Sequence, residues 1–326
     1  MRLLLAAAAL VLLAAAAPGW KWALPDGVAP PPVPAANGMS AAKVELGRRL
    51  FYDADLSSDG TLACSSCHEQ RHAFADSVAT RPGVNGEPGL RNAPGLANVA
   101  WLDRLTFANP HATSLEVHAP TPLTGENPVE MGMKGKEDEF ARRLGADACY
   151  RRMFARAFPE RDGRIDLTTV AAALAAFQRT ITSWNSPYDR FRRGERGALS
   201  PLAQEGERLF RVRGCAACHS GPHLTDMDYH RLEEVRARDP GLIGQTGLSG
   251  DAGRFRTPSL RNAELTGPWW HDGTARSLEE AIGRHPDPVA AEDVPALVAF
   301  LHGLTDPHFV TDPRLARPVK ACGRTL

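Results

Sequence analysis

The chain has 326 residues, no net formal charge and an ordinary hydrophobic fraction of 43%. The balanced charge gives no sign of a nucleic-acid or membrane-surface partner, since such partners favour a basic chain. The length is more typical of two modest domains than of one.

The N-terminus has the pattern of a secretory signal peptide. Arg2 supplies a positive charge, residues 3–13 are apolar, and residues 14–17 are small alanines suited to cleavage. A permanent membrane anchor is the alternative, but the apolar run is short for a span of about 20 residues. We therefore expect removal of residues 1–17, export to the periplasm, and no membrane span in the mature chain.

Helical patterns recur along the mature chain. After a proline-rich lead-in, Ser40 is a candidate N-cap for a helix that ends near Tyr52. Asp166 is a candidate cap for another helix, in which apolar residues repeat at helical spacing. The polar stretch of residues 185–197 is predicted to be a linker, and a helix is expected over residues 201–210.

Four of the six cysteines form two copies of a C-x-x-C-H motif, at residues 64–68 and 215–219. Two thiols at this spacing can both bond to the vinyl groups of one haem, and the adjacent histidine then becomes an axial ligand of the iron. A zinc ribbon would need closely spaced cysteine pairs, and the export signal excludes cytosolic thioredoxin-like chemistry. The sequence therefore predicts two covalent haems c, held by Cys64, Cys67 and His68 and by Cys215, Cys218 and His219.

Each motif follows a helix that ends in Gly-x-Arg-Leu-Phe, at residues 47–51 and 206–210, which suggests an internal duplication. Strand patterns are scarce. We predict a mostly α-helical fold with two cytochrome-c-like haem domains, residues 26–187 and 188–326, and long irregular loops around the haems. Two cysteines are left over, and they either pair in an oxidising compartment or stay separate thiols: Cys149 and Cys322.

Several stretches resemble the bacterial di-haem cytochrome c peroxidases and their MauG-like relatives, and they are spread over most of the mature chain. They are ELGRRLFYD (residues 45–53), CHEQRHAF (67–74), LRNAPGLANVAW (90–101), NPVEMG (127–132), FRTPSLRNAELTGPWWHDG (255–273) and SLEEAI (277–282). Residues 107–132 are most similar to one branch, the MauG-like enzymes of methanobactin operons. That branch is encoded with a copper-associated, four-cysteine partner protein, and its best-known member oxidises a tryptophan of that partner.

The resemblance implies a division of labour between the two haems. Hydrogen peroxide would react at the first haem, which has an open distal side. The second haem, with two protein ligands, would store or relay electrons. By the same match Glu130 is the distal-pocket glutamate, a candidate general base and then acid for peroxide. Without the resemblance, Glu130 would be taken as a solvated loop carboxylate.

The resemblance also implies a calcium ion between the haems. Its protein ligands would be the side chain of Asn92 and the carbonyls of Thr266 and Pro268, and oxygen ligands suit this hard cation. Without the resemblance, Asn92 would be taken as a turn residue.

Three positions depart from the family pattern. His118 replaces the usual distal glutamine, where a histidine would assist proton transfer or ligate the iron. Phe107 replaces a tryptophan that lies between the haems of many relatives, so an electron-hopping relay at that position is doubtful. His285 replaces the distal methionine or tyrosine of the second haem, which predicts a bis-histidine haem; the alternative is a surface histidine. The candidate substitutes for the lost relay are Trp101, Trp269 and Trp270.

Three functions fit these observations. The first is a peroxidase that reduces hydrogen peroxide with electrons from a small redox protein. The second is a MauG-like oxidase that uses peroxide to oxidise a tryptophan or another residue of a protein partner. The third is a non-enzymatic di-haem electron carrier. Glu130 and the open first haem disfavour the carrier, whereas Phe107 and His285 disfavour the oxidase.

Overall fold

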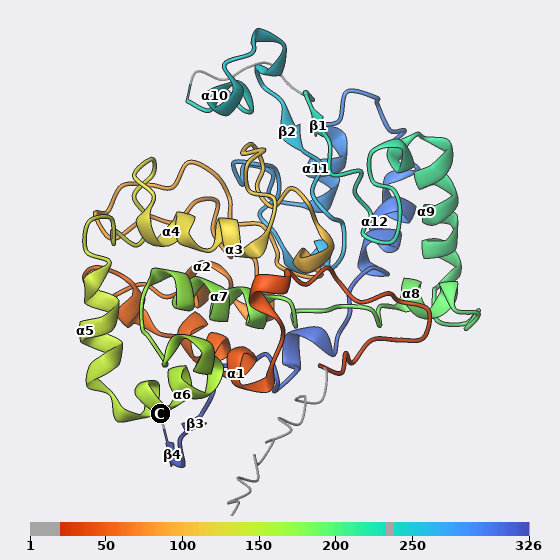
Figure 1. Ribbon diagram of the computed structural model, residues 1–326. Helices are drawn as coiled ribbons and strands as arrows, with labels where there is room; N and C mark the ends of the chain where they lie inside the picture. Colours follow the sequence, from red (N-terminus) through yellow and green to blue (C-terminus); the bar gives the residue numbers. More distant parts are fainter. Residues whose placement is uncertain (1–19, 233–237, 326) are drawn as a thin grey trace, which may run out of the picture.

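The computed structural model describes residues 20–232 and 238–325, so the expected signal peptide lies outside the described residues. Within them the fold is mostly α-helical with long irregular connections, as predicted (Figure 1). The α-helices are α1 (Ala41–Phe51), α2 (Cys64–Cys67), α3 (Leu115–His118), α4 (Pro120–Thr124), α5 (Asp138–Ala146), α6 (Ala148–Ala157), α7 (Leu167–Gln178), α8 (Pro187–Arg192), α9 (Pro201–Val212), α10 (Ile243–Thr246), α11 (Leu278–Gly283) and α12 (Val294–His302). Short strands form two antiparallel pairs, β1 (Tyr229–His230) with β2 (Phe255–Arg256) and β3 (Lys320–Ala321) with β4 (Arg324–Thr325). Among the described helices, none combines the length and the apolar character needed to cross a bilayer.

The two helices predicted from their capping residues form at those residues. α1 begins after Ser40, whose side chain accepts a hydrogen bond from the backbone N–H of Lys43. α7 begins after Asp166, which forms a reciprocal capping box with Thr169. Both caps satisfy backbone donors that the first helical turn leaves without partners.

The predicted linker at residues 185–197 is wrong, because α8 occupies part of it. Ser186 caps this helix by accepting a hydrogen bond from the backbone N–H of Asp189, and Pro187 takes the first helical position, where its fixed φ favours a helix. The many charged side chains favoured the prediction of a linker, although the stretch contains ordinary start signals for a short helix.

Two equivalent helix pairs account for the repeated Gly-x-Arg-Leu-Phe sequence. α1 packs against α7 at Gly47, where an added Cβ would lie 1.9 Å from the carbonyl oxygen of Ala173. α9 packs against α12 at Gly206, where an added Cβ would lie 1.9 Å from the carbonyl oxygen of Ala296. Glycine is required at both positions because only a missing side chain lets the helix backbones approach this closely.

Each helix pair belongs to its own hydrophobic core. Leu46, Phe51 and Phe177 lie in the first core, whereas Leu209 and Phe300 lie in the second. The two cores are consistent with an internal duplication, in which each copy buries one apolar face of its own helices. The ribbon shows α1 and α7 in one half of the molecule and α9 and α12 in the other (Figure 1).

The C-terminal tail returns to the first core. Phe309 and Leu315 are buried there, and a disulfide joins Cys149 of α6 to Cys322. The ribbon accordingly places β3 and β4 below α6 (Figure 1). The range expected for the second domain, 188–326, thus includes a tail that packs on the first core, and the two leftover cysteines form a pair.

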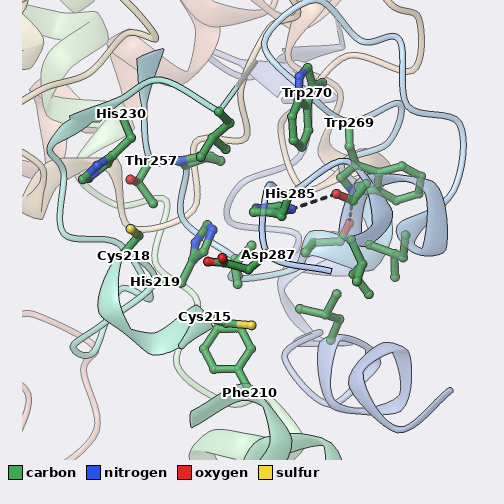
Figure 2. Close-up of a pocket in the computed structure, with 18 of the residues that line it drawn as sticks. Phe210, Cys215, Cys218, His219, His230, Thr257, Trp269, Trp270, His285 and Asp287 are labelled. Carbon is green, nitrogen blue, oxygen red and sulfur yellow. Dashed lines mark hydrogen bonds between the residues drawn. The ribbon is translucent and has the colours of Figure 1, made fainter. Parts of the chain in front are cut away.

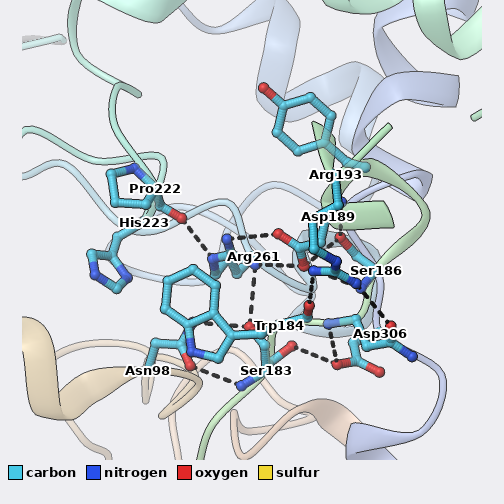
Figure 3. Close-up of polar contacts among 12 residues, drawn as sticks. Asn98, Ser183, Trp184, Ser186, Asp189, Arg193, Pro222, His223, Arg261 and Asp306 are labelled. Carbon is cyan, nitrogen blue, oxygen red and sulfur yellow. Dashed lines mark hydrogen bonds and ion pairs between the residues drawn. The ribbon is translucent and has the colours of Figure 1, made fainter. Parts of the chain in front are cut away.

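A buried polar network joins the two halves at Ser183 (Figure 3). Asn98 of the first half accepts from the backbone N–H of Ser183 at 2.8 Å and donates to its carbonyl at 2.9 Å. Asn262 of the second half donates to the Ser183 hydroxyl at 3.1 Å. Beside them, Arg261 forms two hydrogen bonds of 2.9 Å with Asp189. Paired polar groups in a buried interface fix one relative orientation of the two halves.

We expect the substitution Gly47→Ala to destabilise the protein by roughly 1–3 kcal/mol, the usual cost of overpacking a close contact. The matched control is Gly145→Ala in α5, where the nearest neighbour of an added Cβ, on Ile165, lies at 3.8 Å. Alanine should stabilise that helix by up to about 1 kcal/mol. Thermal unfolding followed by circular dichroism measures both changes. Equal melting temperatures for Gly47→Ala and the wild type would contradict the close contact.

Candidate haem-binding and peroxide sites

The first C-x-x-C-H motif presents its histidine in the form that a metal requires. Cys64 and Cys67 lie on the single turn of α2, and His68 follows it. The Nδ1 atom of His68 lies 2.8 Å from the carbonyl oxygen of Phe74. A ring that donates Nδ1–H to a carbonyl leaves Nε2 as the metal-binding nitrogen. Phe74 has a left-handed backbone with φ 60°, and its fully buried ring packs against Phe51 of α1.

The second motif repeats this arrangement. The Nδ1 atom of His219 lies 3.3 Å from the carbonyl oxygen of Leu224, which is also buried and left-handed with φ 53°. Leu224 lies in the second core together with Phe210, the counterpart of Phe51. Both proximal histidines are therefore oriented by a strained, buried residue that the Gly-x-Arg-Leu-Phe helix supports.

His285 lies across the second pocket from His219 (Figure 2). Their ring centres are 6.4 Å apart, and the Nδ1 atom of His285 lies 2.9 Å from the carbonyl oxygen of Ala281 in α11. Metal–imidazole bonds of about 2 Å place the ring centres of two imidazoles on one metal roughly 6 Å apart. Burial, with the nearby His285, lowers the pKa of His219 to about 4, so this ring is neutral as a ligand must be. The pair has the spacing to bind one iron.

A cavity of about 290 Å³ surrounds this histidine pair. Its wall includes the motif cysteines Cys215 and Cys218, and Phe107 from the first half reaches it as well. Trp270 also lines it, with its ring centre 5.4 Å from that of His285 and the two rings perpendicular (Figure 2). An apolar cavity with two thiols and two opposed imidazoles fits a covalently bound haem.

The structure brings Glu130 and His118 to the first motif. The pKa of the Cys64 and Cys67 thiols is raised to about 12, chiefly by burial, and the charge of Glu130 contributes to both shifts, so this carboxyl lies within electrostatic reach of both. Burial, with the nearby His68, lowers the pKa of His118 to about 4. His118 is therefore neutral at pH 7 and lies close to the first proximal histidine.

Local contacts position the backbone segments that carry these two side chains. His118 ends α3, which Glu116 anchors through hydrogen bonds of 2.6 Å with Arg179 and 2.7 Å with Asn37. The backbone carbonyl of Glu130 accepts from the N–H of Val84 at 2.9 Å. Glu130 is exposed to solvent in its loop, yet the protein atoms around its carboxyl raise its pKa by partial burial. Within the described residues, the buried Nδ1 atom of His118 has no hydrogen-bond partner.

An aromatic cluster that the sequence did not indicate lies between the two halves. The ring centre of Trp184 lies 5.5 Å from that of Trp101. It also lies 5.3 Å from that of His223 and 4.2 Å from the guanidinium of Arg261 (Figure 3). Of the candidate relay tryptophans, Trp101 therefore belongs to this cluster, whereas Trp270 lies at the second pocket. Neither Trp184 nor His223 belongs to a motif, so only the tertiary contact identifies them.

The residues expected to bind calcium lie near the contact between the halves. Asn92 is buried, its side-chain amide donates to two backbone carbonyls at 3.1 and 3.2 Å, and its backbone N–H donates to the carbonyl of His271 at 2.8 Å. These donations leave the amide oxygen of Asn92 as an available ligand. The full set with the carbonyls of Thr266 and Pro268 stays a prediction.

Comparisons with known proteins agree with this geometry. The family model of the di-haem cytochrome c peroxidases matches residues 41–197. The chain is 34% identical to the cytochrome-c peroxidase IdrP1 of Denitromonas iodatirespirans, with 97% of this chain and 96% of the relative covered. It is 33% identical to the methylamine utilization protein MauG of Methylorubrum extorquens, with 87% and 84% covered.

A solved structure agrees as well. A MauG-like protein associated with microbial copper homeostasis is 38% identical, with a TM-score of 0.88 over 93% of this chain and 100% of that one. Identity of this degree over nearly the whole chain, together with the two haem-attachment motifs, extends beyond a shared fold. The chain therefore belongs to the di-haem cytochrome c peroxidase and MauG family, whose members are oxidoreductases that act on peroxide.

Proposed function

We propose that the protein is a periplasmic oxidoreductase in which hydrogen peroxide reacts at an N-terminal haem and a C-terminal haem relays electrons. Cys64, Cys67 and His68 would hold the first haem, and Cys215, Cys218, His219 and His285 the second. The distance of 6.4 Å between the ring centres of His219 and His285 supports this assignment most directly. An iron with two imidazole ligands has no free position for peroxide, whereas an iron with one has an open position.

The first haem, when bound, supplies an iron that accepts oxidising equivalents from peroxide. Glu130 takes the proton from the inner peroxide oxygen and returns it to the outer oxygen, which then leaves as water. Burial raises the pKa of this carboxyl, which makes the ionised form a stronger base. The unpartnered Nδ1 of neutral His118 is available to hold peroxide or a water by a hydrogen bond.

The oxidising equivalents have two candidate destinations. In a peroxidase, a small redox protein supplies electrons through the second haem, and the named peroxidase relative that matches 97% of this chain supports this function. In a MauG-like oxidase, a residue of a protein partner is oxidised instead. The similarity to the MauG-like protein associated with copper homeostasis supports this second candidate, with a four-cysteine copper-associated protein as the expected partner.

Stopped-flow mixing with peroxide, with and without prior reduction, distinguishes the two destinations. A peroxidase should return to its resting spectrum when a reduced small cytochrome or cupredoxin is present. An oxidase should return only with the protein partner, whose mass should then change. Absence of any reaction with peroxide would leave the electron carrier and would contradict both candidates.

The two C-x-x-C-H motifs predict two haems c per chain, measurable by a pyridine haemochrome assay on purified protein. The Cys215→Ser/Cys218→Ser variant should retain one. The matched control, Cys149→Ser/Cys322→Ser, removes the disulfide and should retain two. One haem in the wild type, or haem that acid–acetone extracts, would refute the assignment.

The Glu130→Gln variant should react with peroxide about 10²-fold more slowly or worse, because it keeps the size of the side chain but loses the base. In the wild type the rate should rise with pH as the carboxyl ionises, and since burial raises its pKa, the rise should come above the pH at which an ordinary glutamate ionises. The glutamine variant should lack this rise. Glu126→Gln, at an exposed carboxylate of the same loop, is the control, and an unaltered rate in Glu130→Gln would remove Glu130 from the mechanism.

The His285→Ala variant should convert the second haem from six-coordinate low-spin to high-spin, because no other ligand replaces the imidazole. Resonance Raman spin-state marker bands of the ferric protein measure this change. His308→Ala, at an exposed histidine, should leave the bands unaltered. Unchanged low-spin bands in His285→Ala would show that another residue binds the iron.

A further inference from the structure

Among the described residues, one buried arginine lacks the acidic partner that the other buried cations have. Five lysine and arginine residues are buried in the described chain. Four of them form ion pairs: Lys43 with Glu160, Arg49 with Asp147, Arg179 with Glu116 and Arg261 with Asp189. The exception is Arg256, which is 3% exposed and forms no ion pair with any described carboxylate.

The hydrogen bonds of Arg256 go only to neutral groups. Its Nε donates to the carbonyl of Thr106 at 3.1 Å and one terminal nitrogen donates to the carbonyl of Thr257 at 2.8 Å. Burial lowers the pKa of Arg256 to about 10, and the opposing charges of Tyr229, Asp103 and Asp226 are too weak to offset it. A buried guanidinium stays charged, so its burial is unfavourable unless an anion compensates it.

The position of Arg256 indicates where that anion binds. Arg256 lies on β2 and lines the cavity that contains His219 and His285. Its backbone N–H donates to the carbonyl of Phe107 at 2.7 Å, on the side of the cavity that the first half contributes. Arg213, the other arginine of the wall, already pairs with Asp293. The cavity therefore presents one uncompensated cation to whatever occupies it.

We propose that Arg256 binds a propionate carboxylate of the haem in this cavity and thereby raises the reduction potential of that haem. The inference rests on the proposed second haem. A haem carries two propionates, and the guanidinium is the side chain whose planar donors best match a carboxylate. Reduction adds a negative charge at the iron, so a cation fixed nearby in a low-dielectric cavity stabilises the reduced state.

The test is a spectroelectrochemical titration of the low-spin haem in the holoprotein. In Arg256→Gln the ratio of oxidised to reduced haem at a fixed potential should rise about tenfold, a fall of about 59 mV for a one-electron couple. Arg256→Lys should recover much of this difference, because it restores the charge. The control is Arg254→Gln, which removes a partly exposed cation that bonds to Asp251 and the Tyr229 carbonyl.

A purely structural role gives a different result. If Arg256 only supports the Thr106 and Thr257 carbonyls, Arg256→Gln should lower the melting temperature and leave the potential unchanged, which would overturn the proposal. Should Arg256→Gln fail to fold, the propionate bending modes in resonance Raman spectra of Arg256→Lys decide, because lysine cannot form the forked contact. Unshifted modes would overturn the proposal. A protein without the second haem would instead refute the proposed function.

Discussion

The orientation of the proximal histidines depends on two backbone carbonyls, those of Phe74 and Leu224. Each accepts from the Nδ1 of a motif histidine, at 2.8 Å for His68 and 3.3 Å for His219. Both acceptor residues adopt left-handed backbones, which costs a non-glycine residue about 1 kcal/mol or more. Their buried side chains stabilise this conformation, since each packs in one of the two cores. The helix pairs, the cores and the histidine tautomers thus form one connected arrangement, present twice.

The two copies differ on the side opposite the proximal histidine. In the C-terminal copy the segment that follows α11 supplies His285, whose ring faces that of His219. In the N-terminal copy a short helix supplies His118, and a loop supplies Glu130, whose pKa burial raises. In the proposed function, one proximal arrangement would serve an electron-relaying site in one half and a proton-transferring site in the other. Phe107 reaches from the first half into the second cavity.

Local sequence signals predicted much of the fold and the core of the site. The caps at Ser40 and Asp166 and the two C-x-x-C-H motifs depend on residues within a few positions of one another, so sequence spacing determines them. The sequence could not decide whether Cys149 and Cys322 pair, because a disulfide over a separation of 173 residues has no local signal. The unpaired Arg256, the Trp184 cluster and the return of the tail to the first core likewise depend on contacts between distant segments. The calcium ligands and the division at residue 187 remain predictions.

The account depends on one haem being open and one being closed. Quantitative electron paramagnetic resonance of the ferric wild-type protein tests this most directly, because it counts each spin state per chain. We predict one high-spin iron and one low-spin iron in equal amounts. Two low-spin irons, with His118 or another residue closing the first site, would contradict the division of labour between the two haems.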